Sequence, residues 1–126
     1  MKKFLLLGIL LISIASFSET HTGSFVSKIH QISGEVSLET TGKEITITNF
    51  TYDGNGKNVY LILTKDGDFK DMKVISKELK KAYVNETLTL KVNNLQKLTD
   101  EGYNTVSVYT KTNKSSFGDA ALSEVQ

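Results

Sequence analysis

Apolar and polar residues alternate in several short runs along the chain. Val36 and Leu38 alternate with polar side chains in residues 34–39, and residues 87–92 repeat the pattern. Successive side chains of a strand point to opposite faces, so each alternating run predicts a strand with one buried face. Further strands are predicted at residues 23–27, 45–52, 59–63, 104–110 and 116–122.

Residues 45–63 (ITITNFTYDGNGKNVYLIL) contain two of these runs on either side of a turn-rich segment, DGNG at 53–56. Asn and Gly tolerate the positive φ angles of tight turns, so this pattern predicts a β-hairpin. Residues 59–63 are apolar on both faces, which predicts a central strand.

Within the first of these two runs, the apolar residues move from odd to even positions. Ile45 and Ile47 occupy odd positions, whereas Phe50 and Tyr52 occupy even ones. A β-bulge near Thr48–Asn49 would return all four side chains to one face. The alternative is a strand buried on both sides, and we favour the bulge.

Helix is expected in few places. Residues 94–102 (NLQKLTDEG) predict one or two turns closed by Gly102. Residues 76–84 (SKELKKAYV) allow a short helical turn at most. About eight short strands with little helix predict an all-β fold, a single antiparallel β-sandwich or a related barrel.

The start of the chain resembles an export signal. Two lysines precede an apolar run at residues 4–14, and small residues then suit a cleavage site before Glu19. The run is too short to span a bilayer about 30 Å thick. We therefore expect a signal peptide at 1–18 and one β-sandwich domain at 19–126. The cleaved protein would be periplasmic or secreted, with no membrane association.

Composition removes several kinds of chemistry. The chain has no Cys, Trp, Pro or Arg, so it has no thiol for redox or metal chemistry. Without Lys2 and Lys3, 13 lysines face 14 acidic residues, which leaves no excess of positive charge for nucleic acid. Catalytic motifs such as GxSxG and HExxH are absent, and we expect no enzymatic activity.

Candidate binding residues are few. His30 is either an axial haem or metal ligand or a rim histidine, and without neighbouring ligands the second role is favoured. Asp53, Asn55 and Asn58 faintly resemble a calcium loop, but DGNG also forms ordinary turns, so no cofactor is expected. A ligand or glycan would most readily meet His30 and a small set of polar and aromatic residues: Asn49, Tyr52, Tyr60 and Tyr109.

A series of short motifs resembles the DM13 domain in order and spacing. The motifs are Gly23-x-Phe25, His30-x-x-Ser33-Gly34, NFTYDGNG at 49–56, Val59-Tyr60, Asn104-x-Val106-x-Val108-Tyr109 and Phe117-Gly118-Asp119-Ala120-x-Leu122. The resemblance implies an extracytoplasmic, DOMON-like β-sandwich, a strand near residues 74–75 and an irregular linker after it. It also implies a redox role, because many members carry one cysteine and related domains bind haem.

The chain departs from the DM13 pattern at that cysteine. In family members the cysteine follows an aromatic residue in the penultimate strand. The matching residues here are Tyr109 and Thr110, so Thr110 is expected at the position of the thiol. A hydroxyl cannot form a mixed disulfide or be reversibly oxidised. We therefore expect a non-catalytic binding or accessory module for a protein, polymer or small molecule; electron transfer is the alternative.

Overall fold

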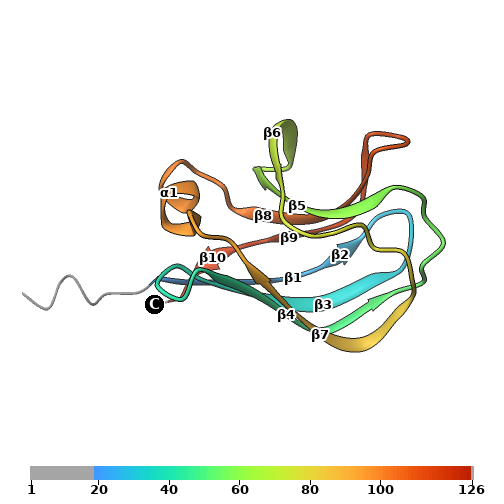
Figure 1. Ribbon diagram of the computed structural model, residues 1–126, viewed down its shortest axis with the longest axis horizontal. Helices are drawn as coiled ribbons and strands as arrows, with labels where there is room; N and C mark the ends of the chain where they lie inside the picture. The colour runs from blue at the N-terminus through green and yellow to red at the C-terminus, as the bar shows by residue number, and fades with distance from the viewer. Residues whose placement is uncertain (1–18, 126) are drawn as a thin grey trace, which may run out of the picture.

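Ten strands form two five-stranded antiparallel sheets that pack face to face (Figure 1). The computed structural model describes residues 19–125, so the predicted signal peptide lies outside the described residues. The first sheet has the order β10 (Ser123–Glu124), β1 (Thr20–Ser24), β3 (Ile32–Glu39), β4 (Glu44–Tyr52), β7 (Tyr83–Lys91). The second has the order β2 (Val26–Ser27), β9 (Ser115–Ala121), β8 (Thr105–Thr110), β5 (Val59–Lys65), β6 (Asp68–Val74).

The predicted all-β sandwich is confirmed, with ten strands in place of about eight. One added strand arises because the predicted strand at 23–27 divides at Phe25, and β1 and β2 join opposite sheets. Gly23 permits the close approach at this corner. A Cβ there would lie 2.1 Å from the carbonyl oxygen of Ala121.

The predicted hairpin at 45–63 is wrong. β4 pairs with β3 and β7 in the first sheet, whereas β5 pairs with β8 and β6 in the second. The six residues 53–58 therefore cross from one sheet to the other. Positive φ angles at Gly54 and Asn58 explain the turn-like composition. Turn residues report local backbone geometry, and they do not select the partner of a strand.

The predicted bulge in β4 is confirmed. The pairing of β4 with β7 shifts between Ile47 and Phe50, and Asn49 between them has a φ of 54°. As a result, the apolar side chains before and after the bulge are all fully buried in one core: Ile45, Ile47, Phe50 and Tyr52.

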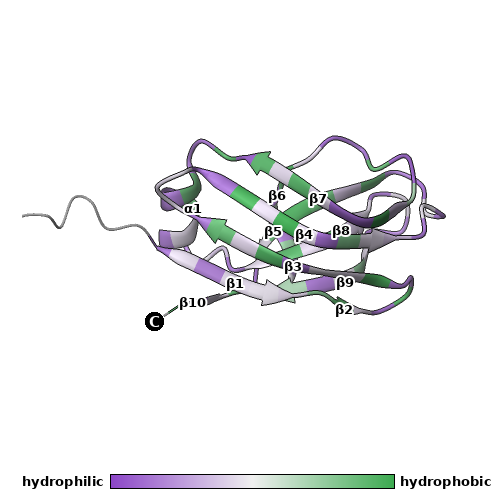
Figure 2. Cartoon of the chain, turned by 90° about the horizontal axis from the view of Figure 1, so that it is seen from below, coloured by the Kyte–Doolittle hydropathy of each residue, from purple (hydrophilic) through white to green (hydrophobic). Residues whose placement is uncertain are grey.

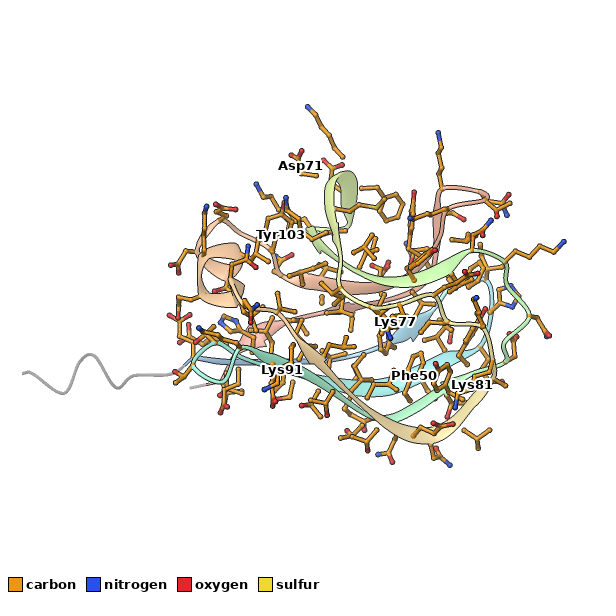
Figure 3. All side chains as sticks on the ribbon, viewed as in Figure 1. Phe50, Asp71, Lys77, Lys81, Lys91 and Tyr103 are labelled. Atoms are coloured by element: carbon orange, nitrogen blue, oxygen red, sulfur yellow. The ribbon has the colours of Figure 1, made fainter. Side chains whose placement is uncertain are left out.

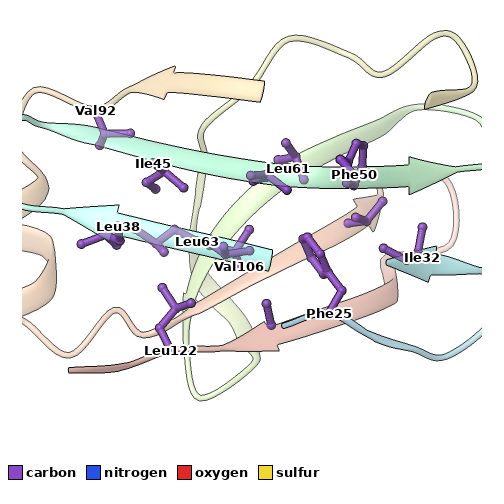
Figure 4. Close-up of a cluster of buried hydrophobic side chains, with 14 of the residues drawn as sticks. Phe25, Ile32, Leu38, Ile45, Phe50, Leu61, Leu63, Val92, Val106 and Leu122 are labelled. Carbon is purple, nitrogen blue, oxygen red and sulfur yellow. The ribbon is translucent and has the colours of Figure 1, made fainter. Parts of the chain in front are cut away.

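The core lies between the two sheets. Apolar and polar residues alternate along β3 and β4 (Figure 2), and the inward side chains of both sheets meet in a single cluster (Figure 4). β5 is also buried on its outer face, where Ile62 has no exposed surface, which agrees with the predicted central strand.

The single helix in the described residues is α1 (Leu95–Asp100), which ends before Gly102 at a φ of 103° as predicted. Residues 76–82 are irregular and contain no helix. Within residues 19–125, no helix has the length and apolar character needed to cross a membrane.

Candidate ligand site at the loop end of the sandwich

Three loops meet at one end of the sandwich, opposite α1 (Figure 1). They connect β2 to β3, β4 to β5, and β8 to β9. Their side chains enclose a cavity of about 280 Å³. The cavity is lined by Ile29, His30, Asn55, Gly56, Lys57, Thr110, Thr112, Asn113 and Phe117. Three positions chosen from the sequence, His30, Asn55 and Thr110, are thus brought together.

His30 is held in a defined orientation. Its Nδ1 lies 3.0 Å from Oδ2 of Asp53, and its ring packs on Phe117 with centroids 4.2 Å apart. An ionised carboxylate only accepts hydrogen bonds, so Nδ1 carries the proton and Nε2 of the neutral ring is an acceptor. The side chain is 25% exposed, so a ligand can reach it.

Asp53 is fixed from two sides. Its Oδ1 accepts a hydrogen bond from the backbone N–H of Asn55 at 2.9 Å, while Oδ2 faces His30. The Asn55 N–H is the main cause that lowers the pKa of Asp53; partial desolvation opposes it and His30 adds to it. Asp53 therefore remains ionised and keeps His30 oriented.

Tyr52 stabilises the crossing loop from below. Its hydroxyl accepts a hydrogen bond from the backbone N–H of Gly56 at 2.8 Å. Burial raises the pKa of Tyr52, and the charge of Asp53 adds to this, whereas the Gly56 bond opposes it. A Cβ at Gly56 would lie 2.4 Å from the Phe117 ring, so glycine is required for this packing. The Tyr52 hydroxyl therefore stabilises the crossing loop.

Thr110, which the sequence motifs predict to stand at the family cysteine position, forms part of the cavity wall. It is 1% exposed, and its hydroxyl donates to the carbonyl of Lys57 at 2.7 Å and accepts from the N–H of Thr112 at 3.2 Å. Thr110 therefore lines the same cavity as His30.

The other predicted ligand-binding residues do not line this cavity. Asn49 lies in the bulge, where Nδ2 donates to Glu35 at 3.0 Å. Tyr60 lies beneath the ammonium of Lys111, 4.3 Å from the ring centroid. Tyr109 is buried against Phe69, with ring centroids 4.9 Å apart. These two tyrosines are packing residues of the second sheet.

Hydrogen bonds engage two of the three predicted calcium ligands, Asp53 and Asn58. Both oxygens of Asp53 are engaged, and Nδ2 of Asn58 donates to the hydroxyl of Thr112 at 2.8 Å. Residues 19–125 contain no group of three or more His, Cys, Asp or Glu side chains placed to hold a metal ion. The residues around His30 also do not fit a His/Met haem site, because Met72 belongs to β6 and is not in the cavity wall.

A second polar cluster, not predicted from the sequence, lies around Asp119 of β9. Asp119 accepts hydrogen bonds from the hydroxyls of Ser107, at 2.6 Å, and Ser116, and its other oxygen lies 2.9 Å from Nζ of Lys28. Burial raises the pKa of Asp119, but these three partners outweigh that effect and hold it below the ordinary value. In the sequence, the FGDA motif at residues 117–120 was the signal that could have pointed to this cluster.

The fold and the loop-end cavity define the class of protein: a small antiparallel β-sandwich domain with a candidate ligand site among its end loops. A family model described as "Electron transfer DM13" matches residues 24–122. The chain belongs to the DM13 family. No curated protein and no solved structure matches it.

Proposed function

We propose that this protein is a non-catalytic extracytoplasmic binding module that holds a small polar ligand in the loop-end cavity. The observation that carries the proposal is the orientation of His30. Its Nδ1 is engaged by Asp53, so Nε2 is the ring atom left for a ligand. A fixed tautomer presented at a cavity is typical of a recognition residue.

The lining indicates the chemistry of the ligand. Nε2 of a neutral His30 ring is an acceptor, the ammonium of Lys57 is a donor, and the amides of Asn55 and Asn113 supply both kinds of group. The ring of Phe117 gives an apolar surface beside them. A small hydroxylated molecule, such as one carbohydrate unit, matches this mixture of donors, acceptors and one apolar face.

The binding test uses nuclear magnetic resonance with a panel of monosaccharides. Backbone amide shifts of residues 29–30, 55–57 and 110–113 should move on titration, and His30→Gln should weaken binding at least tenfold. His21→Gln is the matched control, because His21 lies on β1 and contacts Glu19. Equal loss in both variants, or shifts confined to other surfaces, would contradict the proposal.

Electron transfer is the second candidate, supported by the family description and by the cavity that Thr110 shares with His30. Such a role needs a centre with two accessible oxidation states, and threonine provides none. We expect colourless protein after purification from its native host. A Soret band that disappears in His30→Gln would favour electron transfer.

Export is part of the proposal and rests on residues 1–18. The intact mass of protein recovered outside the cytoplasm should correspond to a chain that starts at Glu19. Full-length protein in the membrane fraction would contradict it.

A further inference from the structure

A groove of about 720 Å³ runs beside β7, the edge strand of the first sheet. Its other wall is the segment 74–79, which follows β6 and lies along β5 through the bonds from the N–H groups of Ile75 to Leu61 and of Leu79 to Val59. Figure 1 shows this segment passing from the second sheet towards β7. Lys77 and Lys91, labelled in Figure 3, come from the two walls.

The groove exposes hydrogen-bonding groups of the β7 backbone. The N–H of Val92 donates to the carbonyl of Lys43. Leu90 and Leu88 lie opposite Ile45 and Ile47 of β4, two and four residues further along the same ladder. Inward and outward bonding directions alternate along an antiparallel strand. The N–H and C=O groups of Thr89 and Lys91 therefore point to the free edge. Within residues 19–125, β7 pairs with β4 alone.

The side chains beside this edge are apolar at alternate positions. Leu88 and Leu90 are half-buried and line the groove, while Leu61 and Leu79 are buried within its wall. An extended chain that pairs with Thr89 and Lys91 would place every second side chain over these leucines. The same chain would satisfy the free backbone groups.

Two common protections of a strand edge, a β-bulge and a proline, are absent from residues 88–91 of β7. The register between these residues and β4 is regular, and the shifts occur nearer to Tyr83. Lys91 lines the groove, but its ammonium is paired with Glu44 of β4 at 2.7 Å. Proteins usually shield edge strands with bulges, prolines or outward lysines.

We propose that the groove binds an extended segment of another polypeptide, which adds to the first sheet as a strand beside β7. Main-chain bonds to Thr89 and Lys91 would supply affinity, and apolar side chains at alternate positions would supply selectivity. About five residues, or roughly 17 Å of extended chain, would be engaged. This site is separate from the loop-end cavity and does not depend on the small ligand.

The test begins with a displayed library of random eight-residue peptides selected on the full exported chain. The best peptide should carry apolar residues at alternate positions. Thr89→Pro removes the outward N–H and keeps the bonds to β4, and Thr89→Ala is the matched control that retains the N–H. We expect at least a tenfold loss of affinity for Thr89→Pro and less than a twofold change for Thr89→Ala.

A second measurement acts on the peptide and does not depend on the folding of the variants. Two versions of the peptide are compared, one N-methylated at odd positions and the other at even positions. One version should lose binding, and the other should keep it. The proposal would be overturned if both N-methylated versions bound equally or if both Thr89 variants had the same affinity. Failure to select any peptide would also overturn it. Binding of palmitate that displaces the peptide and is unaffected by Thr89→Pro would assign the groove to a small amphiphile instead.

Discussion

Single hydroxyl and carboxyl groups hold the loops of this domain in place. The hydroxyls of Tyr52 and Thr110 each bond to the crossing loop that joins β4 to β5, at Gly56 and Lys57. Asp53 completes the arrangement by orienting His30. The loop-end cavity therefore depends on hydrogen bonds that fix the crossing loop and the ring of His30.

Tyr52→Phe tests the bond to Gly56. The substitution keeps the packing but leaves the Gly56 N–H without its acceptor, which costs about 1–3 kcal/mol when the group stays buried. Urea unfolding measures the difference. Tyr60→Phe is the control, since Tyr60 is half-exposed, and its change should stay within about 0.5 kcal/mol. Equal effects would contradict the proposed role of the Tyr52 hydroxyl.

Asp119→Asn tests the polar cluster of β9 through its pH dependence. The pKa of Asp119 is lower in the folded state than its ordinary value of 3.8, so its charge stabilises the fold above pH 3.8. That contribution is lost as the pH falls through the folded-state pKa. At pH 7 the variant should lose about 1–3 kcal/mol.

The difference between wild type and Asp119→Asn should shrink as urea unfolding is repeated below pH 3.8. A difference that is constant from pH 7 to pH 2 would mean that the carboxylate charge does not contribute to stability.

The bulge in β4 is the element that aligns the core. Asn49 supplies the positive φ that lets Phe50 return to the inner face after Ile47. β-branched residues strongly disfavour this backbone conformation, whereas glycine accepts it.

Asn49→Val should therefore lower the free energy of unfolding by about 1–3 kcal/mol, and Asn49→Gly should stay near wild type. Thermal unfolding followed by circular dichroism distinguishes the two variants. If both lose the same stability, the exposed bond from Asn49 to Glu35, not the backbone angle, is what matters.

At the scale of the whole molecule, the described chain passes six times between the two sheets, with the core between them. Two of these crossings lie at Phe25 and at residues 53–58. Hydrogen bonds to Tyr52, His30 and Thr112 fix the crossing at residues 53–58, and we therefore expect that it needs no calcium.

The melting temperature should consequently stay within about 1 °C when calcium is exchanged for EDTA, since only a ligand that prefers the folded state raises it. A rise that disappears in Asp53→Asn would show instead that this loop binds the ion.

Local patterns in the sequence predicted most strands of both sheets, the helix before Gly102 and the bulge at Asn49, but they did not predict β10 or residues 68–73 of β6. Each depends on the period of nearby side chains or on the φ angle of one residue, which the chain carries locally. The family could likewise be inferred from short motifs, and the match to residues 24–122 confirms it.

Tertiary structure alone decided which strands pair and which side chains meet. Residues 53–58 had the composition of a hairpin, yet β4 and β5 entered different sheets because pairing is selected by long-range burial of their apolar faces. His30 and Thr110 are 80 residues apart in sequence and share one cavity only after both sheets have formed. The free edge of β7 also arises from strand order, which no local period encodes.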